Sequence, residues 1–76
     1  MRKWIINDSL GFMVELKGSV IIRLKTTRKG RVIRGYIDVD GLCVGSYESY
    51  ARCKQVYKDI MYFMEDPYMF FNMPKE

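Results

Sequence analysis

Residues 31–47 read RVIRGYIDVDGLCVGSY, two alternating runs of apolar and polar residues joined by Asp40-Gly41. Both joining residues tolerate a positive φ, which a two-residue type I′ turn requires, so the pair is a strong hairpin signal. We therefore predict antiparallel strands over residues 31–39 and 42–47. Within the first of these, four residues share the face that we expect to be buried: Ile33, Gly35, Ile37 and Val39.

The preceding residues contain three more strand patterns. Residues 4–6 and 12–16 are short apolar runs separated by the turn-forming sequence NDSLG, and they form a predicted hairpin. Residues 19–25 alternate with period two, which indicates a half-buried strand. In this strand Arg23 and Lys25 face outward together, and a polar turn over residues 26–30 leads into the next strand.

A helix is predicted over residues 50–65, after Ser49 as the N-cap. Proline at position 67 ends it, because proline disfavours helical geometry in the preceding residue. Apolar residues recur along it at steps of three and four: Tyr50, Cys53, Val56, Tyr57, Ile60, Met61 and Met64. This spacing is typical of a helix that packs one face on a sheet.

These elements predict one α+β domain spanning residues 1–76: a small antiparallel sheet of about four to five strands, with one helix packed on one face. The remaining segment, residues 68–74, is too apolar for a free tail. It either docks on its own sheet as an edge strand or crosses to a neighbouring subunit, and we favour the second. A chain of this length buries little over about 60% of its unfolded surface, so we expect a homo-oligomer, a dimer or higher.

Charge is unevenly distributed, although the formal net charge is only +4. Residues 1–37 contain nine Lys and Arg against two acids, whereas residues 38–76 contain four against seven. No acid lies between Glu15 and Asp38, a segment with seven Lys and Arg. Such a positive field suits phosphate groups. The alternative is a solvated hairpin whose cations keep sheet edges from pairing with one another.

Residue types that are absent or sparse restrict the chemistry. The chain contains no histidine, which removes the commonest general base and a common zinc ligand. Cys43 and Cys53 have neither metal-binding nor redox-motif spacing, so we interpret them as reduced packing residues of a cytoplasmic protein. No apolar run is long enough for a membrane helix. We expect a binding protein with no catalytic residues, metal or cofactor.

Candidate ligand-binding residues come from the outward strand faces, the helix N-terminus and the aromatic residues. We select Trp4, Arg23, Lys25, Arg34, Tyr36, Tyr47 and Arg52. Guanidinium groups bind phosphate in a bidentate manner, and aromatic rings stack on bases. Arg52 lies in the first helical turn, where backbone amides attract anions. The alternatives are cross-strand pairing on a solvated face and, for Trp4, packing in a core or interface.

Four short segments resemble a class of small proteins encoded by phages and prophages of Gram-positive bacteria. They are Trp4-Ile5, Val44–Ser49, Ala51–Ile60 and Phe71–Glu76. Proteins similar to this class include viral sponges that block Thoeris and CBASS immunity by sequestering cyclic nucleotide signals. The resemblance implies a sheet-plus-helix oligomer that holds its ligand at subunit interfaces without turnover. The order Ala51-Arg52 and the residue Tyr57 depart from the class, in which Arg-Ala and leucine are usual.

From the charge pattern and this resemblance we expect a phage-encoded anti-defence protein that sequesters a cyclic nucleotide in the host cytoplasm. The alternative is a stoichiometric inhibitor or nucleic-acid-binding protein whose basic hairpin acts on a host defence complex. A third interpretation is a virion or regulatory module whose apolar C-terminus docks a partner protein.

Overall fold

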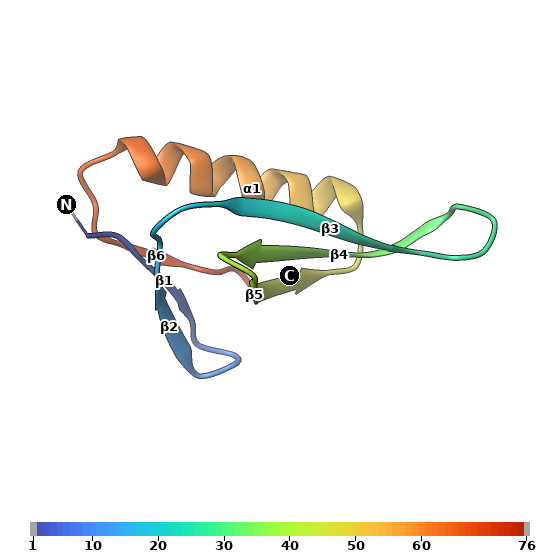
Figure 1. The fold of residues 1–76 in the computed structure, drawn as a ribbon, viewed down its shortest axis with the longest axis horizontal. Coiled ribbons are helices and arrows are strands. Elements are labelled where there is room, and N and C mark those ends of the chain that lie inside the picture. Colours follow the sequence, from blue (N-terminus) through green and yellow to red (C-terminus); the bar gives the residue numbers. More distant parts are fainter. Residues whose placement is uncertain (1, 76) are drawn as a thin grey trace.

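The computed structural model describes residues 2–75 as one helix packed across two small β-sheets (Figure 1). The elements are β1 (Trp4–Asn7), β2 (Phe12–Glu15), β3 (Val20–Thr26), β4 (Val32–Val39), β5 (Leu42–Tyr47), α1 (Tyr50–Glu65) and β6 (Phe70–Asn72). The strand orders are β2-β1-β6 and β3-β4-β5. The predicted α+β fold is confirmed, but its six strands form two three-stranded sheets instead of one sheet of four or five strands.

The β3-β4-β5 sheet is antiparallel throughout and carries the helix on one face. Its β4–β5 turn has φ values of 50° at Asp40 and 86° at Gly41, which confirms the predicted positive-φ turn. The register shifts after Ile37, so that Val44 is an extra residue in β5. Val44 is fully buried, and this bulge is a feature that strict alternation does not predict.

Helix α1 begins and ends as predicted, with the backbone amide of Arg52 donating to the Ser49 hydroxyl at 3.1 Å. Its buried residues are Cys53, Val56, Ile60 and Phe63. Tyr50 and Met64, which were expected on this face, are exposed, because the buried stripe passes through Phe63, whose ring packs against Phe71 of the other sheet. Within the described residues, no helix is both long and apolar enough to cross a membrane.

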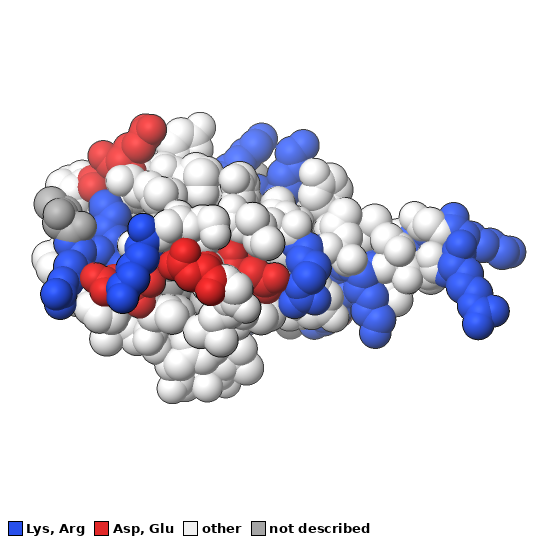
Figure 2. Space-filling model, viewed as in Figure 1, with Lys and Arg blue, Asp and Glu red and all other residues white. Residues whose placement is uncertain are grey.

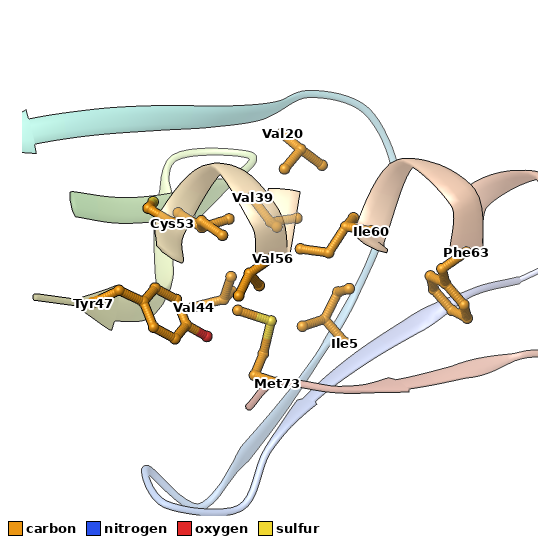
Figure 3. Close-up of a cluster of buried hydrophobic side chains, with 11 residues drawn as sticks. Ile5, Val20, Val39, Val44, Tyr47, Cys53, Val56, Ile60, Phe63 and Met73 are labelled. Carbon is orange, nitrogen blue, oxygen red and sulfur yellow. The ribbon is translucent and has the colours of Figure 1, made fainter. Parts of the chain in front are cut away.

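One hydrophobic core joins the helix to both sheets (Figure 3). Its members are Ile5, Val20, Ile37, Val39, Val44, Tyr47, Cys53, Val56, Ile60, Phe63 and Met73. Cys43 and Cys53 are both free thiols, and burial raises the pKa of the Cys53 thiol, which keeps it neutral among its apolar neighbours. The interpretation of Cys53 as a packing residue is therefore confirmed.

The C-terminal segment docks on its own chain, so the expectation that it crosses to a neighbouring subunit is wrong for this structure. Strand β6 pairs in parallel with β1, the Trp4 amide donating to the Met69 carbonyl and the Met73 amide to the Ile6 carbonyl, both at 2.8 Å. Met73 then enters the core. The second sheet offers an open edge beside β1, which supplies the room that the predicted single sheet lacked.

Lys3 holds the C-terminal end of the helix. Its ammonium group donates to the carbonyl oxygens of Phe63, Asp66 and Tyr68 at 2.6–2.7 Å, and its side chain is only 12% exposed. It also lies 4.4 Å from the centre of the Phe63 ring. A cation there stabilises the negative end of the helix dipole and satisfies carbonyl groups that have no partner within the helix.

Strands β3 and β4 extend past the N-terminal end of the helix as a two-stranded projection (Figure 1). Ile33 was predicted to be buried with Ile37 and Val39, but it is 43% exposed. The reason is position: Ile37 and Val39 lie under α1, whereas Ile33 lies on the projecting part of β4, which the helix does not cover.

Gly35 sets how closely the helix approaches the sheet. A Cβ atom at this position would lie 2.7 Å from the Cys53 Cβ and 3.5 Å from the Ser49 carbonyl oxygen. We expect Gly35→Ala to lower the free energy of unfolding by about 1–3 kcal/mol, because the helix must move outward. Urea denaturation measures this change. Gly41→Asn is the control: no atom lies within 4 Å of a Cβ there, so its loss measures only the strain of a side chain at positive φ, which asparagine lessens, and we expect it to be the smaller of the two. Equal losses in the two variants would contradict the close-packing role of Gly35.

The role of Lys3 is tested by Lys3→Met, which keeps an apolar stem and removes the donors. We expect a loss of about 1–3 kcal/mol in the free energy of unfolding, since two part-buried carbonyl oxygens, of Phe63 and Asp66, lose a charged partner. Lys17→Met is the matched control, because the Lys17 side chain is 74% exposed. If both variants unfold at the wild-type urea concentration, the lysine does not hold the helix end.

Candidate functional site

A pocket of about 340 Å³ lies at the corner where β5 leads into α1. Its volume is within the range of about 300–1,000 Å³ that is usual for small-ligand sites. The lining residues are Arg34, Ser46, Tyr47, Glu48, Ser49, Arg52 and Lys75. They come from β4, from the end of β5, from the start of α1 and from the C-terminal tail, so four parts of the chain build the pocket.

Two strand residues form the sheet side of the pocket. Arg34 of β4 and Ser46 of β5 lie on neighbouring strands, and the Arg34 Nε donates to the Ser46 hydroxyl. This bond leaves the other guanidinium nitrogens of Arg34 as donors. The arginine is therefore held in place on one side while it keeps donor groups for a ligand.

The helix side of the pocket is the N-terminal turn of α1. Ser49 caps the helix, and its carbonyl oxygen accepts the first intrahelical bond from the Cys53 amide at 3.1 Å. The first turn contains no acidic residue and carries Arg52 instead. Partial positive charge at a helix N-terminus and a guanidinium group both favour an anion at this place.

The third side of the pocket is the C-terminal tail. The Tyr47 hydroxyl donates to the Pro74 carbonyl at 2.9 Å, and a Cβ atom on Gly45 would lie 2.6 Å from the terminal methyl carbon of Met73. These contacts fix the tail against the end of β5. Lys75, the next residue, is thereby placed at the pocket.

The pocket lining is positively charged overall. Three cationic side chains, Arg34, Arg52 and Lys75, line it with a single acid, Glu48. Two hydroxyl-bearing residues, Ser46 and Ser49, add neutral polar groups. Charged donors beside hydroxyl groups and helix amides are the groups that bind phosphate oxygens in proteins.

Tyr47 belongs to the wall of the pocket and also to the core. Its side chain is 2% exposed, and burial raises its pKa to about 12, so the phenol is neutral at physiological pH. Because its hydroxyl bonds to Pro74, this tyrosine positions the tail in the structure, whereas the sequence predicted that it contacts a base.

Arg23 and Tyr36, two further predicted site residues, lie together outside the pocket. The Arg23 Nε is 2.9 Å from an Asp38 carboxylate oxygen, and the guanidinium carbon lies 4.4 Å from the centre of the Tyr36 ring. The hydrogen bond to Asp38 raises the pKa of Arg23. Cross-strand pairing, the alternative considered for these residues, therefore describes their contacts in the structure.

Lys25 and Trp4 also lie outside the pocket. Lys25 pairs with Arg34 in the β3–β4 register, on the projecting part of the hairpin. Trp4 is half-buried on β1, in the other sheet, between partners Glu15 and Phe70. Of the seven predicted residues, the structure thus brings together Arg34, Tyr47 and Arg52 at one pocket.

Four pocket residues were not predicted as site residues: Ser46, Glu48, Ser49 and Lys75. Glu48 and Ser49 directly precede the helix, where Ser49 was predicted only as the N-cap. Ser46 follows from strand alternation, since it lies opposite Tyr36 on the outward face of the sheet. Lys75 carries no local signal, because its position depends on the docking of β6 beside β1, a contact between the two ends of the chain.

Comparison of this chain with protein-family models, with curated proteins and with solved structures gave no match. The residues of the pocket and their surroundings therefore carry the functional inference.

The buried position of Tyr47 has a measurable consequence at alkaline pH. The chain contains six tyrosines, and we expect one to ionise only near pH 12. An unfolded tyrosine ionises near pH 10, so the stability that burial contributes is present below pH 10 and is lost as the pH rises toward 12. Absorbance at 295 nm against pH, with circular dichroism to confirm folding, measures this. The ionisation near pH 12 should be absent from Tyr47→Phe. If it persists in that variant, it belongs to another tyrosine.

Proposed function

We propose that this protein binds a small phosphate-bearing ligand in the pocket at the β5–α1 corner and holds it without chemical turnover. The observation that carries the proposal is the convergence of Arg34, Arg52 and Lys75 from three separate segments on one pocket at a helix N-terminus. With three cations and one acid, Glu48, in its lining, the pocket carries a net positive charge, which favours a bound anion.

The polar groups of the pocket support binding better than catalysis. The Ser49 hydroxyl accepts from the Arg52 amide, and the Ser46 hydroxyl accepts from Arg34. Glu48 is the one carboxylate among the described lining residues. A nucleophilic serine needs a neighbouring base, and both hydroxyls here are engaged in structural hydrogen bonds.

The resemblance noted in the sequence supports a nucleotide as the ligand. Three of its four segments supply the pocket: residues 44–49 carry two serines and Glu48, residues 51–60 carry Arg52, and the terminal segment carries Lys75. We therefore propose a phage-encoded sponge that sequesters a cyclic nucleotide immune signal of the CBASS or Thoeris type. In the homo-oligomer that this role implies, a second copy covers part of the ligand.

Thermal unfolding with a panel of cyclic di- and trinucleotides tests the proposal. A ligand at 100 times its Kd adds roughly 2.7 kcal/mol of stability, which raises Tm by more than about 10 °C for a chain of this size. We expect at least one compound to do so. A wild-type protein whose Tm is unchanged by every nucleotide in the panel would contradict the proposal.

Matched variants locate the binding site. Arg34→Ala should weaken the responding nucleotide at least about tenfold, because a charge-assisted hydrogen bond contributes roughly 1.5–3 kcal/mol. Lys58→Ala is the control: it also removes one positive charge, from a helix residue outside the pocket. Isothermal titration calorimetry compares the two variants, and equal losses of affinity would show that net charge, not the pocket, binds the nucleotide.

A further inference from the structure

The projecting end of the β3–β4 hairpin, residues 24–33, is a second feature with its own chemistry, and we call it the basic arm. Residues 23–31 are all exposed, and the arm extends past the body of the molecule (Figure 1). The radius of gyration, 12.6 Å, exceeds the value of about 11 Å expected for a compact chain of 76 residues. The arm therefore presents both strands to an external partner.

The arm carries positive charge alone. Its four cations are Lys25, Arg28, Lys29 and Arg31, and no acid occurs between residues 16 and 37. None of the four takes part in an ion pair within residues 2–75. Figure 2 shows Lys and Arg at the end of the projection and the acids of this face over the opposite half of the molecule.

The tip of the arm is a formed turn. The Thr27 amide donates to the Arg31 carbonyl at 2.8 Å, the Gly30 amide to the Thr27 carbonyl at 2.9 Å, and the Arg31 amide to the Thr27 hydroxyl at 3.2 Å. Gly30 supplies the positive φ of 83° that this turn requires. The cations are thus presented on an ordered scaffold, which lowers the entropy lost on binding.

The strand register places like charges opposite each other. Lys25 faces Arg34 directly across the β3–β4 pair. Two cations directly opposite each other destabilise a hairpin. This pairing therefore does not serve the stability of the fold. A polyanion along the outward face of the arm would offset this repulsion.

The shape and composition of the arm favour duplex DNA over other polyanions. Adjacent strands lie about 4.8 Å apart, and a two-stranded ribbon fits a major groove about 12 Å wide. Residues 24–33 contain no aromatic ring, and single-stranded nucleic acid is held mainly by base stacking on such rings. The tip, residues 26–31, contains no apolar side chain of the kind that anchors protein interfaces, and the exposed apolar residues of the arm, Leu24 and Ile33, lie at its base.

From these observations we propose that the basic arm binds duplex DNA through its phosphate backbone, without reading the base sequence. The arm enters the major groove, and Arg28, Lys29 and Arg31 contact the phosphates at its edges. This site is separate from the pocket at the β5–α1 corner, whose lining contains none of these three residues.

Fluorescence anisotropy with a labelled 20-base-pair DNA duplex tests the proposal. We expect wild-type affinity to fall roughly 40-fold between 50 and 200 mM salt if three phosphate contacts are made. The triple variant Arg28→Gln, Lys29→Gln, Arg31→Gln should lose at least about tenfold in affinity at 50 mM salt. The slope of its log binding constant against log salt concentration should be shallower than that of the wild type by about 2.7. These side chains are exposed, so circular dichroism of the variant should match that of the wild type.

The control is Lys17→Gln, Lys54→Gln, Lys58→Gln, which removes three exposed cations outside the arm. Both triple variants lower the formal net charge from +4 to +1, so only the place of the charge differs. The control should bind the duplex with nearly wild-type affinity. Equal losses in the two variants, or absence of duplex binding, would overturn the proposal. So would binding to another polyanion that is as tight as binding to duplex DNA, or tighter. The polyanions to compare are single-stranded DNA, poly-glutamate and duplex RNA, whose major groove is too narrow for a ribbon.

Discussion

The parallel pairing of β6 with β1 is the contact on which the rest of this structure depends. It joins the two ends of the chain and brings the ring centres of Phe71 and Phe63 to 5.5 Å from each other. The Phe71 ring thereby covers the second half of the helix. The pairing also carries Met73 into the core beside Gly45. The same pairing leaves Lys75 at the helix N-terminus, so that one backbone contact completes both the hydrophobic core and the cationic pocket.

Strand β4 divides the positive charge of the chain between two places. Its covered half lies under α1 and contributes Ile37 and Val39 to the core. Its uncovered half forms the basic arm, and Arg34 lies where the two meet, at the pocket. The helix is offset along the hairpin, because its C-terminal end packs on the other sheet (Figure 1), and this offset separates a concave site for a small anion from an extended site for a polyanion.

Local signals in the sequence predict most of the fold, and long-range contacts account for what they miss. The turn at Asp40-Gly41, the cap at Ser49 and the helix stop before Pro67 act within a few residues, and all three are as predicted. The bulge at Val44 and the split into two sheets depend on packing between distant strands. The alternation of apolar and polar residues along one strand does not predict such packing. The site divides in the same way: Arg34 and Arg52 follow from strand and helix position, whereas Lys75 requires the docked tail.

The most direct test of this account is an isotope-filtered NOE measurement on a mixture of labelled and unlabelled chains. It asks whether the Met73 methyl group contacts the Tyr47 ring of its own chain or that of another. Because Met73 and Tyr47 both lie beside Gly45 in one chain, the account predicts this NOE only within a single chain. An NOE between chains would mean that the tail crosses to a neighbour, and the pocket would then be built by two subunits instead of one.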